Sequence, residues 1–140
     1  LRLLLVEDSA SDELLFRKAA EKSPIAVDIH AMPDADKVMD FLQNHDKKYG
    51  KSQPDIILLD INMPRVNGLQ LLAQIKGDKK CAMIPVIMLT NSVRTKDMLE
   101  AYANHANGFI QKNSDLALFY EDIARILQYW SRTVILPSAA

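Results

Sequence analysis

Short apolar runs alternate with longer amphipathic stretches along the whole chain. This alternation is typical of β-strands joined by helices, the arrangement that builds a parallel sheet with helices on both faces. The pattern predicts five strands, at residues 3–6, 25–31, 55–60, 86–90 and 107–111. It predicts a helix after each strand, and the polar stretch 44–54 before the third strand is expected to be an exposed loop. We therefore predict a doubly wound α/β fold.

The strands differ in how much of their surface the pattern buries. Residues 25–31 alternate, with Ile25, Val27 and Ile29 on one side, as expected of an edge strand with one drier face. The run Ile56–Leu59 has four apolar residues in succession. It is therefore expected to be buried on both faces, at the centre of the sheet.

Polar and small residues mark the helix ends. Ser9 and Ser114 are placed to cap the first and last helices, Gly77 to end the third, and the fourth is predicted at 95–103. The apolar set of the first helix is Leu14, Leu15, Ala19 and Ala20. That of the last helix is Leu116, Phe119, Ile123, Ile126, Leu127 and Trp130. The tail 131–140 carries further apolar residues, so it must fold back or contact a partner.

Length, composition and charge fit one domain spanning residues 1–140, without repeats or linkers. A net charge of −1 gives no basic field for direct binding of DNA or an anionic membrane. The apolar runs are shorter than the roughly 18 residues that span a bilayer. The single Cys81 forms no intrachain disulfide, so a reducing cytoplasmic location is expected. The cluster Lys76, Lys79 and Lys80 is expected to be solvated loop charge.

Chemically distinctive side chains stand where the predicted strands end. Glu7 and Asp8 follow the first strand, Asp60 and Thr90 end the third and fourth, and Lys112 follows the fifth. The carboxyl ends of parallel strands lie at one edge of a sheet, so these residues are expected to meet there. Three clustered carboxylates either raise a pKa or recruit a cation. Together with the Lys112 ammonium, a hard divalent ion such as Mg²⁺ balances their charge.

A magnesium ion held by few carboxylates usually manages a phosphoryl group. Asp60 is then a candidate nucleophile that attacks phosphorus and becomes an aspartyl phosphate, while Lys112 neutralises charge and the Thr90 hydroxyl donates a hydrogen bond. Each residue alone also has a purely structural interpretation, as a helix cap, a strand end or a solvated turn. Their coincidence at the same end of different buried strands favours the functional interpretation.

These residues resemble the receiver domain of bacterial two-component response regulators over nearly the full length of the chain. The matching segments are Leu5–Ser9, Leu58–Pro64 with Gly68, Val86–Thr90 and Phe109–Lys112. The resemblance implies a flavodoxin-like, five-stranded sheet in the order 2-1-3-4-5. It also implies that Asp60 accepts a phosphoryl group from the phosphohistidine of a sensor kinase, in a signalling domain rather than an enzyme.

The resemblance further assigns the metal site and the switch. Asp8, Asp60 and the backbone carbonyl of Asn62 would bind Mg²⁺ directly, and Glu7 would act through a metal-bound water. On phosphorylation, Thr90 would be drawn toward the phosphoryl group. An inward turn of Phe109 would then repack the face formed by the fourth helix, fifth strand and fifth helix, which partners and dimers use. A fixed core position is the alternative for Phe109.

Two positions depart from the receiver pattern. Asn113 follows Lys112, where the family usually has proline, often after a cis peptide. A cis bond before a non-proline residue costs about 3 kcal/mol, so a trans bond and a differently shaped loop are expected, and the placement of Lys112 is in question. Asn91 is bulkier than the small residue usual after Thr90 and would narrow access. These departures support an alternative function, a pseudo-receiver that binds partners without phosphorylation.

An enzyme is the second alternative. Phosphatases of the haloacid dehalogenase type also use a strand-end aspartate nucleophile with Mg²⁺, but they carry another aspartate two residues later, where this chain has Asn62. An asparagine does not serve as a general acid.

The end of the chain bears on partners. No DNA-binding module follows the last helix, so a single-domain regulator that controls an unknown downstream protein by docking is expected. The segments 129–132 and 134–137 resemble the tail of stand-alone receivers that serve phytochrome-type histidine kinases. An ordinary terminal helix packed on the sheet is the alternative. The same tail is the candidate surface for a homodimer.

Overall fold

The computed structural model describes residues 1–44 and 53–139, so most of the predicted loop 44–54 lies outside the described residues. Five parallel strands form one sheet in the order β2-β1-β3-β4-β5, as predicted. The strands are β1 (Arg2–Val6), β2 (Asp28–Met32), β3 (Ile56–Leu59), β4 (Val86–Thr90) and β5 (Gly108–Gln111). The helices are α1 (Ala10–Glu21), α2 (Val38–Gln43), α3 (Gly68–Gly77), α4 (Thr95–Ala103) and α5 (Leu116–Gln128), with short turns η1 (Ala35–Lys37), η2 (Tyr129–Thr133) and η3 (Pro137–Ala139).

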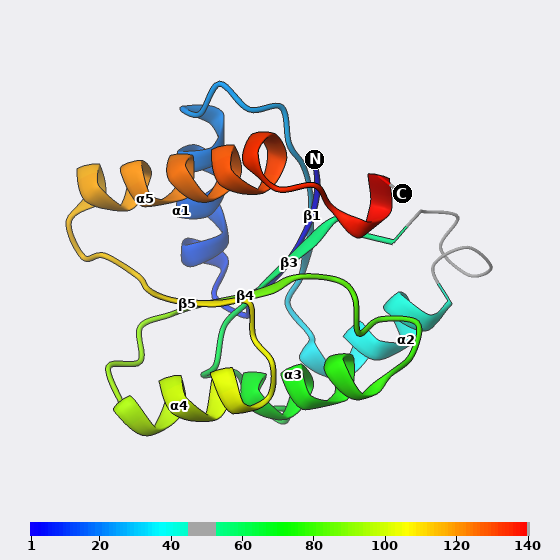
Figure 1. The fold of residues 1–140 in the computed structure, drawn as a ribbon. Helices are drawn as coiled ribbons and strands as arrows, with labels where there is room; N and C mark the ends of the chain where they lie inside the picture. The colour runs from blue at the N-terminus through cyan, green and yellow to red at the C-terminus, as the bar shows by residue number, and fades with distance from the viewer. Residues whose placement is uncertain (45–52, 140) are drawn as a thin grey trace.

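Helices cover both faces of the sheet (Figure 1). Helices α1 and α5 pack together on one face, and α2, α3 and α4 cover the other. The successive side chains of β3 alternate between the two cores, with Ile56 and Leu58 toward α1 and α5 and Ile57 and Leu59 toward the other three helices. All four are fully buried, which confirms the predicted central position. None of the helices described is long and apolar enough to span a bilayer.

Three predicted details of the elements are wrong. Strand β2 begins at Asp28 rather than Ile25, because its first partner on β1 is Arg2. In α1, Leu14 and Leu15 are exposed, and the buried residues are Phe16, Ala19 and Ala20. The apolar face is therefore rotated from the one predicted.

The start of α5 also differs from the prediction, because Leu116, expected on the apolar face, is exposed and the cap is a different residue. Asp115, not Ser114, is the N-cap, and its Oδ1 accepts a hydrogen bond from the backbone N–H of Leu118 at 3.1 Å. The side chain of Asn113 shapes the preceding turn, because its Oδ1 accepts a hydrogen bond from Asp115 N at 2.9 Å. The predicted cap of α1 is confirmed, with Ser9 Oγ accepting from Asp12 N at 3.3 Å.

The tail follows the first of its two predicted alternatives and folds back. After the single π-helical turn η2, Leu136 packs against the core beneath α1 and α5. Ser138 Oγ then donates a hydrogen bond to Asp55 Oδ1 at 2.6 Å. Ile135 remains 90% exposed.

Lys76 is not a solvated loop charge, contrary to the expectation. Its ammonium donates hydrogen bonds to the carbonyl oxygens of Ala82 and Ile84, at 3.1 and 2.9 Å, and to Asn107 Oδ1 at 3.1 Å. Asn107 Oδ1 also accepts from Val86 N at 2.9 Å. Burial lowers the pKa of Lys76. This group ties the end of α3 to the starts of β4 and β5, at the sheet edge opposite the predicted site.

Candidate functional site

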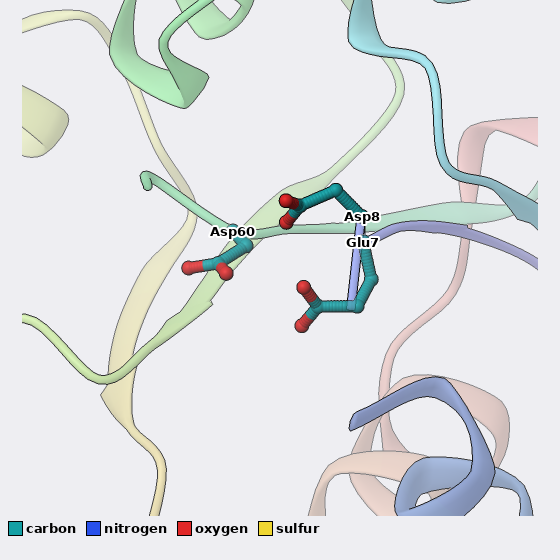
Figure 2. Close-up of side chains that lie close together, drawn as sticks. All are labelled: Glu7, Asp8 and Asp60. Carbon is teal, nitrogen blue, oxygen red and sulfur yellow. The ribbon is translucent and has the colours of Figure 1, made fainter. Parts of the chain in front are cut away.

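Three of the predicted acidic residues meet at the carboxyl edge of the sheet. Glu7 and Asp8 follow β1 and Asp60 follows β3, and these two strands are neighbours. One ligand atom from each carboxylate lies within 4.8 Å of the others. Figure 2 shows the three carboxylate groups gathered around a common space. Glu7 and Asp60 are buried, whereas Asp8 is exposed, so the cluster opens to solvent on one side.

Lys112 reaches this cluster from the end of β5. Its Nζ lies 2.5 Å from Glu7 Oε1 and 3.6 Å from Asp60 Oδ2. The loop with Asn113 in place of proline therefore still delivers the ammonium to the acidic group. No peptide bond among the described residues is cis, as expected for this loop.

Asp12 is a site residue that the sequence reasoning missed. Its Oδ2 accepts a hydrogen bond from Lys112 Nζ at 2.9 Å. The signal was its place in the first turn of α1, because a helix that begins directly after β1 sets its first turn over the same edge of the sheet.

Burial and the ion pairs act in opposite directions on the two buried charges. The pKa of Glu7 is raised to about 7, because burial, together with the charge of the neighbouring Asp60, outweighs the opposing contact with Lys112. Burial disfavours the charged form of Lys112, but its hydrogen bonds to Glu7 and Asp12 outweigh this effect, so its pKa is raised. Lys112 is therefore charged at neutral pH.

Asp60 is positioned by a hydrogen bond from the next backbone N–H and by the close packing of α3. The N–H of Ile61 donates to Asp60 Oδ1 at 2.7 Å. Gly68, the first residue of α3, packs so tightly that an added Cβ would lie 1.9 Å from the Asp60 carbonyl oxygen. Its N–H donates to the carbonyl of Ile61 at 2.8 Å. The glycine therefore fixes the helix start directly against the candidate nucleophile.

Thr90 lies at the end of β4, fully buried, and its carbonyl accepts a hydrogen bond from Lys112 N at 2.7 Å. Its Oγ1 accepts from Ser92 N at 3.2 Å. Ser92 Oγ in turn donates to the buried carboxylate of Asp97 in α4, at 2.5 Å. A chain of hydrogen bonds thus joins the end of β4 to the first turn of α4.

For the remaining predicted residues, the structure gives no hydrogen bond or ion pair with the acidic cluster among the described residues. Asn62 lies exposed two residues beyond Asp60, and metal binding by its carbonyl stays a prediction. Phe109 is half-buried against the core shared with α3 and α4, and its role as a switch also stays a prediction. Asn91 is exposed and lines a cavity of about 180 Å³ together with Asp12, Lys112 and Asn113.

The donor set suits a hard divalent cation. The cluster contains only carboxylate oxygens, which such ions prefer over nitrogen or sulfur. With Asp12 counted, four carboxylates lie at this edge against one buried ammonium, so a divalent ion would offset their excess negative charge. The exposed side of Asp8 leaves room for bound waters. The cluster is therefore a candidate metal site.

Residues 3–124 match the family model described as "Response regulator receiver domain". The chain belongs to this family. The predicted resemblance and the predicted fold are thus both confirmed.

The receiver domain is similar to single-domain regulators over nearly its whole length. It is 34% identical over 137 residues to the response regulator Rcp1 of Synechocystis sp., covering 98% of this chain and 93% of Rcp1. The structure of the phosphorylated cyanobacterial phytochrome response regulator RcpA superposes with a TM-score of 0.89 at 32% identity, covering 97% of each chain. The Mn²⁺-bound form of Rcp1 has a TM-score of 0.88 at 33% identity, covering 97% of this chain and 98% of Rcp1.

Proposed function

We propose that this receiver domain is a phosphorelay regulator that accepts a phosphoryl group on Asp60 from a histidine kinase, in the presence of Mg²⁺. The observation that carries the proposal is the convergence of Glu7, Asp8, Asp60 and the Lys112 ammonium at one sheet edge. A carboxylate in such surroundings is a nucleophile, and the Lys112 ammonium would balance the negative charge of its phosphorylated form.

In the transfer step, one Asp60 oxygen forms a bond to phosphorus while the phosphorus–nitrogen bond of the kinase phosphohistidine breaks. The departing imidazole nitrogen takes a proton. Lys112 balances the charge of the phosphoryl oxygens, and the Thr90 hydroxyl donates to one of them. The domain assists its own phosphorylation and dephosphorylation. The phosphoryl group stays on its own Asp60 until water attacks and releases inorganic phosphate, so it acts as a signalling domain rather than an enzyme.

The ion would be held by Asp8 and Asp60, with the carbonyl of Asn62 as a third ligand and Glu7 acting through a water. When bound, Mg²⁺ neutralises negative charge on the phosphoryl oxygens. The Mn²⁺-bound structure of the relative Rcp1 supports the binding of a divalent ion.

The partner kinase is of the phytochrome type in this proposal, and the domain works in the cytoplasm. The likeness to RcpA, a phytochrome response regulator, supports this assignment. The switch of Thr90 and Phe109 would alter the face formed by α4, β5 and α5 and so control a downstream protein. Ile135, 90% exposed in the tail, is the side chain we expect at a homodimer contact.

Incubation with Mg²⁺ and acetyl phosphate, followed by intact mass measurement, tests the proposal. The wild-type domain should gain one phosphate, Asp60→Asn should gain none, and the exposed Asp36→Asn should match the wild type. Absence of any adduct on the wild type would favour the pseudo-receiver. Release of phosphate from simple phosphoesters, with turnover, would favour the phosphatase.

A further inference from the structure

Lys112 is shared unequally among three carboxylates. Its Nζ is within hydrogen-bonding distance of Glu7 Oε1, at 2.5 Å, and of Asp12 Oδ2, at 2.9 Å. Lys112 Nζ also forms an ion pair with Asp60 Oδ2, but their separation of 3.6 Å is too long for a hydrogen bond. The ammonium therefore sits on the α1 side of the cluster, away from the candidate nucleophile.

Asp12 is well placed to hold the Lys112 ammonium on this side of the cluster. Its backbone N–H is fixed by the hydrogen bond to Ser9 Oγ, which anchors the first turn of α1. Its side chain is 29% exposed and lies outside the group of three carboxylates that could bind a metal. The next acid along the helix, Glu13, pairs instead with Arg17, at 3.0 Å. Asp12 thus contacts the site through Lys112.

A phosphoryl group on Asp60 would compete with Asp12 for this ammonium. It adds negative charge and acceptor oxygens beside Asp60, so Lys112 gains charge-assisted hydrogen bonds by moving toward them. That movement lengthens the contact with Asp12, which is itself charge-assisted. An equilibrium shifts only by the difference in interaction between its two states, so the Asp12 contact favours the unphosphorylated one.

We propose that Asp12 is a positioning residue that holds Lys112 in its resting place and so restrains the phosphorylated state. The inference rests on the proposed role of Asp60 as phosphoacceptor. Asp12 would make the domain respond only to a stronger phosphorylating input.

Titration with beryllium fluoride in Mg²⁺, followed by calorimetry, measures the restraint, because this probe occupies the position of a phosphoryl group on a carboxylate. Asp12→Asn should bind the probe about fivefold more tightly than the wild type, which corresponds to about 1 kcal/mol. Asp12→Glu keeps the carboxylate and should bind like the wild type. Glu13→Gln, which removes the same charge one residue later, should also bind like the wild type.

A double-mutant cycle separates positioning from plain charge repulsion. If Asp12 acts through Lys112, Asp12→Asn should change nothing in a Lys112→Met background. If Asp12 merely repels the anion, the gain should persist there, and the proposal is wrong. Unchanged or weaker binding by Asp12→Asn alone also overturns it. Thermal unfolding checks each fold, with Asp12→Ser as a second variant.

The wild-type titration separates a failure of Asp12 from a failure of Asp60. Binding by the wild type but no gain in Asp12→Asn rejects the role of Asp12 and leaves Asp60 as phosphoacceptor. No binding by the wild type, together with no acetyl phosphate adduct, rejects the phosphoacceptor itself and the role of Asp12 with it.

Discussion

Because α3 packs so closely against Asp60, we expect even a methyl side chain at Gly68 to destabilise the fold strongly. In Gly68→Ala, the new Cβ would lie 1.9 Å from the Asp60 carbonyl oxygen and 2.8 Å from both the Asp60 carbonyl carbon and Ile61 Cα. All three atoms belong to the backbone, so no side chain can move aside. The start of the helix must retreat until the shortest contact reaches at least 3.0 Å.

This retreat has two costs. Overpacking in a well-filled core costs about 1 to 3 kcal/mol. The hydrogen bond from Gly68 N to Ile61 O, now 2.8 Å, is stretched or lost, at about 1 kcal/mol. The better helix propensity of alanine returns at most about 1 kcal/mol. We expect the free energy of unfolding to fall by about 1 to 4 kcal/mol, and Mg²⁺ affinity to fall because Asp60 is displaced.

Urea unfolding followed by circular dichroism measures this loss, and the other end of the same helix supplies the control. At Gly77, an added Cβ would have no atom within 4 Å, so Gly77→Ala should be neutral or stabilising by up to about 1 kcal/mol. Equal stability of the two variants would refute the argument from close packing.

Three further predictions concern single contacts. His105 follows the end of α4 with a positive φ of 68°, a conformation that glycine adopts more readily than histidine. His105→Gly should therefore stabilise the fold by about 1 kcal/mol and raise the thermal midpoint. A lower midpoint would contradict this. Ser92→Ala leaves the buried Asp97 carboxylate without its donor and should cost about 1 to 3 kcal/mol in urea unfolding, whereas Ser114→Ala, at an exposed site that is not the cap, should cost little. Burial raises the pKa of Asp55, but hydrogen bonds from Arg2 and Ser138 outweigh it and lower the pKa below 3.8. Its contribution is therefore present above that pH and lost below it, so Asp55→Asn should destabilise at neutral pH and have a smaller effect in acid; an equal loss at both would count against the assignment.

The strand pattern was sufficient to predict the sheet and the edge where the site lies. Continuous apolar runs identify strands buried on both faces, and polar residues at their ends fall together because parallel strands all point the same way. Helix α4 was predicted with its observed bounds, since Thr95–Ala103 lies between clear polar turns. The same argument predicted the meeting of three side chains that the structure shows in contact, Glu7, Asp60 and Lys112.

The errors arose where tertiary contacts outweigh local pattern. Leu14 and Leu15 are exposed because the packing of α1 against α5 selects Phe16 and the two alanines that follow on its face. Lys76 looked solvated, but two carbonyl oxygens of the loop that follows α3 and the side chain of the more distant Asn107 all accept hydrogen bonds from it. The place of Asp12 in the first turn of α1 indicates the right edge of the sheet, but it does not identify Lys112 as the partner, because that contact joins residues 100 positions apart.

The hydrogen bonds of Asp55 bring the two ends of the chain to one place. Its carboxylate accepts from Arg2 N at 2.7 Å and from Ser138 Oγ at 2.6 Å, and Figure 1 shows both ends on the same side of the molecule. A short linker could therefore join them, and new ends could be opened in a surface loop to give a circular permutant. By the same geometry, the domain could be inserted as a cassette into a loop of a host protein, with its acidic cluster facing outward.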